Sequence, residues 1–185
     1  HGRRVGLASV WGLRCETVEV LITGASGFIG SALRPALINA GHRPVVAVRG
    51  HQVPAGVDGV AWDPVAGMID VPALEGIGGV VHLAGAGIGD RRWTASRKRL
   101  ILESRIKPTE LLASTLAALD RKPMVFVSSS AVGYYGDRGD EILTEASGPG
   151  DDFTAQVCQG WENAASPIAQ AGIRLVTIRT GIVLG

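Results

Sequence analysis

The chain has 185 residues, of which 46% are hydrophobic and 19% are charged. This balance excludes a disordered chain and suffices for one domain with a buried core. The formal net charge of +1 gives no reason to expect nucleic-acid binding, and no apolar run reaches the roughly 20 residues that span a bilayer.

Cysteine and histidine usage excludes two further classes. Cys15 and Cys158 fit neither a disulfide framework nor a metal site, and the four histidines are scattered without metal-ligand spacing. A cytoplasmic location is the simplest expectation. Residues 1–17 hold three arginines and one acid. A targeting segment would explain this composition, but we expect a tag, a linker or the tail of a preceding domain.

From Val18 onward, apolar runs alternate with helical patterns, which is typical of βαβ units around a parallel sheet. A helix is predicted from the turn at 24–30 to about residue 40, closed by Gly41, and two more over 94–118 and from 152 to about 171. Each contains a proline that should bend it. Strands are predicted over 18–23, 44–48, 60–62, 79–83, 124–127 and 175–178. Right-handed crossovers would wind them into an α/β, Rossmann-like, doubly wound parallel sheet with helices on both faces.

A glycine-rich turn, Thr23-Gly24-Ala25-Ser26-Gly27-Phe28-Ile29-Gly30, follows the first strand and opens a helix. Gly24 would allow the sharp turn, Gly27 would let the backbone approach a pyrophosphate, and Gly30 would let the helix pack against the sheet. The helix N-terminus would offer unpaired N–H groups to the phosphates. The alternative is an ordinary tight turn without a ligand; the flanking strand and helix favour dinucleotide binding.

The end of the second strand distinguishes the two nicotinamide cofactors. An acid there would bind the ribose 2′-hydroxyl of NAD, but this strand ends in Arg49, which suits the 2′-phosphate of NADP. Arg43 and His51 are candidates to assist. The alternative is a solvated loop arginine. We expect NADP(H) rather than NAD(H).

Several further motifs extend beyond the turn: His82-Leu83-Ala84-Gly85, Arg92-Trp93, Ser104-Arg105, Gly133-Tyr134-Tyr135-Gly136-Asp137, Trp161-Glu162 and Arg179-Thr180-Gly181-Ile182-Val183-Leu184. With the turn, they cover the chain from Val18 to its end. The chain resembles an atypical extended short-chain dehydrogenase/reductase of the NAD-dependent epimerase family, in the YfcH-like and SDR39U1-like branch.

This resemblance implies cofactor roles for a set of residues: Gly24, Ser26, Gly27, Phe28 and Ile29 at the pyrophosphate, Arg49 at the adenosine phosphate, Asp63 near the adenine, Leu83, Ala84 and Gly85 under the ribose and nicotinamide, and Ser104 on the long helix behind that strand. Ser130 matches the serine that polarises a substrate oxygen. The resemblance also implies that 18–185 is the NAD(P)-binding domain and that a small C-terminal substrate region is absent from this chain.

The family's catalytic Tyr-x-x-x-Lys pair is missing. Counted back from Glu162, its positions hold Thr154 and Cys158, which cannot supply a proton donor with a fixed cation beside it. Tyr134 and Arg138 have the spacing but lie in a glycine-rich loop, where the match is accidental. Tyr135 or its neighbour remains a candidate to act on a substrate, against a packing role.

Two functions follow from these residues. The first is an NADP-dependent oxidoreductase or epimerase that acts on a small molecule, such as an anionic compound or a nucleotide sugar, with Ser130 and Tyr135 as catalytic residues. A basic cluster between Arg91 and Arg99 would receive an anionic group, although a solvated helix face is the commoner outcome. The second is a non-catalytic NADP(H)-binding redox sensor or interaction module, because the Tyr/Lys pair is absent.

Overall fold

The computed structural model describes residues 16–184, so the predictions for residues 1–15 lie outside the described residues. One seven-stranded sheet, in the order β4-β3-β2-β1-β5-β6-β7, forms the centre of the fold. Every neighbouring pair is parallel except β3 and β4. The strands are β1 Glu19–Thr23, β2 Arg43–Arg49, β3 Gly59–Asp63, β4 Met68–Ile69, β5 Gly79–His82, β6 Val125–Ala131 and β7 Arg174–Thr180.

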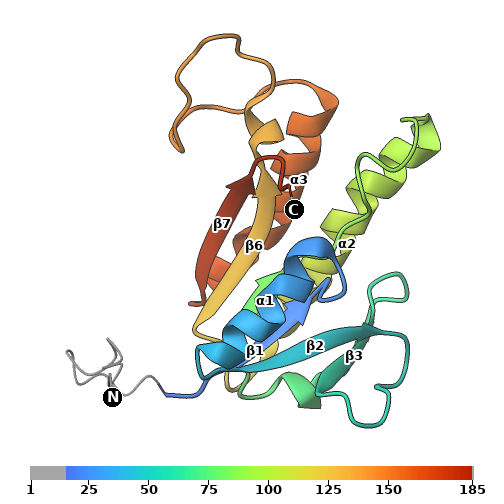
Figure 1. Ribbon diagram of the computed structural model, residues 1–185, viewed down its shortest axis with the longest axis vertical. Coiled ribbons are helices and arrows are strands. Elements are labelled where there is room, and N and C mark those ends of the chain that lie inside the picture. Colours follow the sequence, from blue (N-terminus) through green and yellow to red (C-terminus); the bar gives the residue numbers. More distant parts are fainter. Residues whose placement is uncertain (1–15, 185) are drawn as a thin grey trace, which may run out of the picture.

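Three helices connect the strands: α1 Phe28–Asn39, α2 Ala95–Ala118 and α3 Phe153–Gln170, with two short 3-10 turns, η2 Pro72–Leu74 and η3 Val132–Tyr135. Figure 1 shows α1 on one face of the sheet and α2 with α3 on the other. The doubly wound Rossmann-like fold is thereby confirmed. The order of strands reverses between β1 and β5, and ligands of such sheets bind outside the carboxyl ends of the strands at that point.

The hydrophobic core lies mainly between the sheet and the pair α2 and α3. Leu21, Val80 and Phe126 from three adjacent strands are fully buried there, together with Leu112 of α2 and Ile168 of α3. Burial of side chains of this size stabilises a fold by about 1.5–3 kcal/mol each. The packing holds the carboxyl ends of β1, β5 and β6 in register, and these ends carry the candidate site.

Local signals account for the helix ends. The backbone N–H groups of Gly41 and His42 donate to the carbonyls of Ile38 and Leu37, and Gly41 has φ +85°, so a Schellman motif closes α1 as the glycine predicted. Thr94 caps α2 by accepting from the Arg97 N–H at 3.2 Å. The capping carboxylate of α3 is Asp152. All three helices continue past their prolines.

The sequence did not predict β4. Asp63 accepts hydrogen bonds from the N–H groups of Val65 and Ala66, and Gly67 has φ +68°, so the chain reverses and Met68–Ile69 pairs antiparallel with β3. Two residues are too few to show the alternation that identifies a strand. Among residues 16–184, no helix is both long and apolar enough to cross a membrane.

Candidate cofactor and active site

The glycine turn follows β1 directly and lies against the loop after β5. Gly24 has φ +70°, and a Cβ there would come within 2.9 Å of the Leu83 carbonyl carbon and 3.0 Å of the Ala84 nitrogen. Only glycine combines this conformation with so close an approach. The sharp turn predicted for Gly24 is therefore present, and it brings the ends of β1 and β5 together.

The start of α1 presents bare backbone. Gly27 is the N-cap and supplies no side chain, and a Cβ at Gly30 would lie 2.7 Å from the Ala25 Cα. Gly30 therefore lets the helix pack on the turn itself rather than on the sheet. The side chains of Phe28 and Ile29, which open the helix, are 59% and 40% exposed. The N–H groups of a first helical turn have no intrahelical partner, so an anion can take them.

A groove of about 600 Å³ opens beside this turn. It brings together three segments predicted to hold the cofactor: the glycine turn, the end of β2 with Arg49, and the loop after β5. Arg34, on α1, adds a second cation to its wall. The lining residues are Gly24–Gly27, Arg34, Val46–Arg49, Trp62 and Leu83–Gly85.

The two cations proposed to assist Arg49 lie in different places. Arg43 starts β2, at the opposite end from Arg49, and pairs with Glu19 at 3.0 Å and with Asp58 at 3.9 Å. The prediction that it assists is wrong, because the strand holds the two arginines apart. His51 lies two residues beyond Arg49, and its charge contributes to the lowered pKa of Asp63. Sequence reasoning missed Arg34; its place one turn after Gly30 on α1 was the available signal.

A second hollow of about 670 Å³ adjoins the groove and shares Arg49 and Gly85 with it. Asp63 and Ser104 both line it. Hydrogen bonds from Ala66 and Val65 lower the pKa of Asp63. The Ser104 hydroxyl accepts from the Ala86 N–H at 3.0 Å and donates to the Ile101 carbonyl at 3.0 Å, so it ties α2 to the loop after β5. Their predicted cofactor roles stay predictions.

A buried chain of hydrogen bonds fixes that loop from below. The N–H groups of Leu83 and Ala84 donate to the Thr23 hydroxyl oxygen, which lies 2.7 Å from Nδ1 of His82. Nε2 of His82 lies 2.9 Å from the Thr109 hydroxyl, and that hydroxyl donates to the Arg105 carbonyl at 2.6 Å. One proton arrangement satisfies every contact: Thr23 donates to Nδ1, and Nε2–H donates to Thr109.

His82 is therefore neutral. It is fully buried among the rings of Trp62, Phe126 and Trp161, with centroids 5.9–6.5 Å away. Burial lowers its pKa to about 3. The interpretation of His82 as a satisfied core residue rather than a catalyst agrees with these contacts.

The two predicted catalytic residues belong to one polar cluster around Arg179. Ser130 is 2% exposed, and its hydroxyl donates to Oε1 of Glu162 at 2.6 Å. Arg179 binds both oxygens of Glu162 at 2.8 and 2.9 Å and donates to the Tyr135 hydroxyl at 2.9 Å. Its guanidinium carbon also lies 3.5 Å from the Tyr134 ring centroid. Tyr135 is 8% exposed, so here both predicted catalytic hydroxyls face protein partners.

Charge in this cluster is balanced. Burial opposes ionisation of Glu162, but hydrogen bonds from Arg179 and Ser130 outweigh it and hold its pKa below the ordinary value. The Glu162 carboxylate raises the pKa of Arg179. Arg138 pairs with Glu141 at 2.7 Å rather than with Tyr134, which agrees with their spacing being accidental.

The positions of the missing Tyr/Lys pair do lie at the end of β6. A Cβ at Gly133 would be 3.2 Å from Cβ of Thr154 and 4.0 Å from Sγ of Cys158. The Thr154 hydroxyl donates to Asp152, and the Cys158 thiol lies 3.7 Å from the Ala131 carbonyl. Burial raises the pKa of Cys158. Neither side chain can itself supply the proton donor or the fixed cation of the Tyr/Lys pair.

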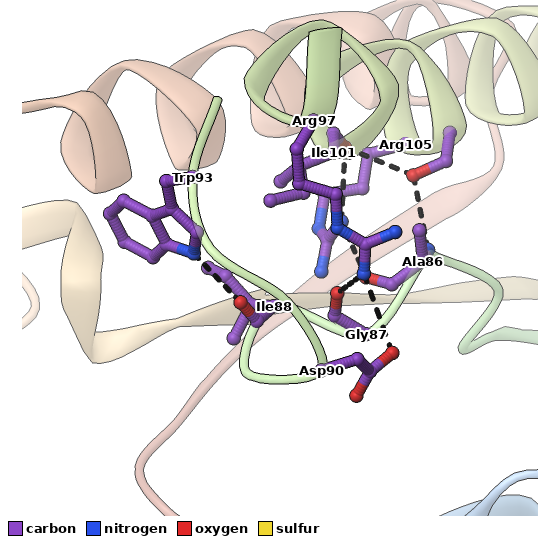
Figure 2. A network of polar contacts seen from close by, with 9 residues as sticks. Ala86, Gly87, Ile88, Asp90, Trp93, Arg97, Ile101 and Arg105 are labelled. Atoms are coloured by element: carbon purple, nitrogen blue, oxygen red, sulfur yellow. Dashed lines mark hydrogen bonds and ion pairs between the residues drawn. The ribbon is translucent and has the colours of Figure 1, made fainter. Parts of the chain in front are cut away.

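The segment after β5 is tied to α2 by two arginines of that helix (Figure 2). Arg97 donates to the Gly87 carbonyl and lies 3.4 Å from Asp90, and Arg105 donates to the Ala86 carbonyl at 3.1 Å. The other cluster members are exposed: Arg91, Arg92, Lys98 and Arg99. The Trp93 and Phe153 ring centroids lie 5.2 Å apart, and Nε1 of Trp93 donates to the Ile88 carbonyl at 2.8 Å.

Comparison with known proteins agrees with this geometry. A family model described as "NAD dependent epimerase/dehydratase family" matches residues 20–185. The chain belongs to the NAD-dependent epimerase/dehydratase family. An epimerase family protein of Mycobacterium leprae is 42% identical over 165 residues, which cover 89% of this chain and 52% of the relative.

Two solved structures are also similar to this chain. Human epimerase family protein SDR39U1 (isoform 2), crystallised with NADPH, is 31% identical with a TM-score of 0.77 over 91% of this chain and 55% of that one. A nucleoside-diphosphate sugar epimerase from Corynebacterium glutamicum is 42% identical with a TM-score of 0.76 over 91% of this chain and 35% of that one. The predicted SDR39U1-like branch is confirmed, and the chain spans about half the length of its curated relatives.

Proposed function

We propose that this epimerase-family chain binds NADP(H) and is the cofactor-binding part of an oxidoreductase or epimerase. The substrate would be a small anionic molecule, such as a nucleotide sugar. One observation carries the proposal: a bare glycine turn and two arginines, Arg34 and Arg49, line the same groove. The turn suits a pyrophosphate, and the arginines suit an additional phosphate. The human relative was crystallised with NADPH, which supports the cofactor. The relative from Corynebacterium glutamicum is named a nucleoside-diphosphate sugar epimerase, which supports the substrate class.

Residue roles in this proposal follow the groove. Ser26, Gly27, Phe28 and Ile29 would hold the pyrophosphate through their backbone, while Arg49 and Arg34 would hold the 2′-phosphate. Asp63 and Ser104 would border the adenosine, and Leu83–Gly85 would pass under the dinucleotide. When bound, the cofactor supplies hydride chemistry; the chain binds it, orients it and sets the local charge.

The test is a fluorescence titration of NADPH and NADH against Arg49→Ala, with Arg43→Ala as the matched control. Losing one charge-assisted phosphate contact should weaken NADPH binding roughly tenfold and leave NADH binding unchanged. Arg43→Ala removes an arginine from the same strand at its other end, so both affinities should be unchanged. Equal losses for NADPH and NADH in Arg49→Ala would contradict the 2′-phosphate role.

A second function, an NADP(H)-binding redox sensor or interaction module without turnover, is favoured by Thr154 and Cys158 at the catalytic positions and by the engagement of Ser130 with Glu162. NADPH consumption across a panel of nucleotide sugars and carbonyl compounds separates the two. Turnover that disappears in Ser130→Ala supports the enzyme. NADPH binding without consumption of any compound supports the sensor.

A further inference from the structure

We propose that Arg105 supplies the positive charge that Tyr-x-x-x-Lys enzymes take from their lysine, and that it acts on the ribose and nicotinamide half of the cofactor. This inference rests on the proposed NADP(H) binding. The cation would thus come from α2 rather than from α3, on which the lysine position holds Cys158.

Arg105 lies where the loop after β5 meets both helices (Figure 2). Its Nη1 donates to the Ala86 carbonyl at 3.1 Å and to the Ile101 carbonyl at 3.0 Å, and its guanidinium carbon lies 5.0 Å from the Trp161 ring centroid. A Cβ at Gly85 would be 3.3 Å from the same carbon. Because Gly85 lines the groove, the guanidinium lies directly behind the groove wall.

This place is on the β5–β6 side of the fold, whereas Arg49 lies across β1 from it on β2. Arg105 packs on the face of α3 that carries Cys158, because its guanidinium carbon lies 5.0 Å from the ring centroid of Trp161, three residues further along that helix. Burial raises the pKa of that thiol, so it offers Arg105 no counter-charge at neutral pH. A cation therefore stands beside the lysine position although the lysine is absent.

Arg97 and Arg179 are also part-buried, but each of them contacts a carboxylate, whereas within the described residues Arg105 does not. Arg179 is neutralised by both oxygens of Glu162, while no carboxylate in residues 16–184 lies within 4.0 Å of the Arg105 guanidinium. Burial lowers its pKa, which reflects the cost of holding that charge unpaired. Arg105 therefore brings a charge with no paired acid among the described residues to the loop after β5.

The donors of Arg105 are also only partly used. Both hydrogen bonds come from Nη1, and Nε and Nη2 have no hydrogen-bond partner within the described residues. A planar fork of N–H groups can bind ribose hydroxyls or stabilise negative charge on a substrate oxygen. A guanidinium stays protonated near neutral pH, so Arg105 can bind and polarise but cannot deliver the proton.

The test measures NADPH affinity and thermal midpoints in Arg105→Met, Arg105→Lys and the double variant Arg105→Met/Cys158→Lys. Arg99→Met is the control, because it removes one charge from an exposed position of the same helix. We expect Arg105→Met to weaken NADPH binding roughly tenfold and Arg105→Lys to weaken it less than about threefold. The double variant should regain most of the loss, and Arg99→Met should bind as the unmodified chain does.

Adenosine 2′,5′-bisphosphate, which carries only the adenosine half of NADPH, separates this inference from the proposed function. All four variants should bind it unchanged. If the unmodified chain binds neither NADPH nor adenosine 2′,5′-bisphosphate, the proposed function fails. If the unmodified chain binds both ligands and Arg105→Met binds NADPH with the same affinity as the unmodified chain, the proposed role of Arg105 fails. The double variant restores a positive charge on α3 but not the contact with Ala86. If it binds NADPH as weakly as Arg105→Met does, the proposed role of the Arg105 charge is also overturned. If Arg105→Met does not fold, folded Arg105→Lys carries the test. A tenfold loss of NADPH affinity in Arg105→Lys, which keeps the positive charge, would overturn the proposal.

Discussion

Acidification from about pH 7.5 to about pH 5.0 should destabilise this chain mainly through one fully buried side chain, His82. Burial lowers its pKa from 6.5 to about 3, so the unfolded chain takes up a proton in this interval that the folded chain does not. Because the unfolded state binds more protons, the free energy of unfolding falls as the pH falls below about 6.5.

The magnitude follows from the width of that interval. Each pH unit below the unfolded pKa costs about 1.4 kcal/mol for one proton, so pH 5.0 should cost about 2 kcal/mol relative to pH 7.5. The hydrogen bonds explain why the folded state resists protonation. Nδ1 accepts from Thr23, whose oxygen already receives the Leu83 and Ala84 N–H groups, so a proton on Nδ1 would break the chain of donors.

Urea unfolding at both pH values measures this cost in the unmodified chain and in His82→Gln. Subtracting the pH-dependent change in the variant's free energy of unfolding from that of the unmodified chain removes the contributions of all other titrating groups. The variant should be less stable at pH 7.5, because a glutamine cannot contact both Thr23 and Thr109, but it should lack the additional loss of about 2 kcal/mol at pH 5.0. If His82→Gln loses as much stability as the unmodified chain, the buried neutral histidine is not the cause.

Two more predictions concern the turn and the polar cluster. Gly30→Ala places a Cβ 2.7 Å from the Ala25 Cα, so it should cost about 1–3 kcal/mol in urea unfolding and abolish NADPH binding. Gly148→Ala, with open space around it, should stay within about 0.5 kcal/mol; equal effects at the two sites would refute the argument. Glu162→Gln should cost about 2 kcal/mol at neutral pH because it leaves Arg179 unpaired. Because the pKa of Glu162 is lowered in the folded state, the stabilisation it provides is present above about pH 4.5 and is lost as the pH falls below that value. Glu162→Gln should therefore lose less folding stability on acidification than the unmodified chain does. Equal losses in the two proteins would contradict the pairing.

Local patterns in the sequence determined the order of elements, the Rossmann-like fold and the place of the glycine turn. Each depends on neighbouring residues: a buried strand, a glycine with positive φ at Gly24, and a helix that starts without a side-chain cap. The caps at Thr94 and Asp152 are local in the same sense. The two-residue strand β4 was not predicted from the sequence, because it is defined only by its pairing with β3.

The tertiary structure alone decided which charges meet. Arg43 and Arg49 belong to one strand, yet only Arg49 faces the groove, and Arg34 joins it from another element. Ser130, Glu162, Arg179 and Tyr135 come from four elements and form one cluster. Arg105 reaches the face of α3 that carries Cys158 and Trp161 from a different helix. Hydrophobic periodicity specifies which face of a helix or strand is buried, but not which side chains from distant elements come within hydrogen-bond distance, because that depends on how the elements pack together.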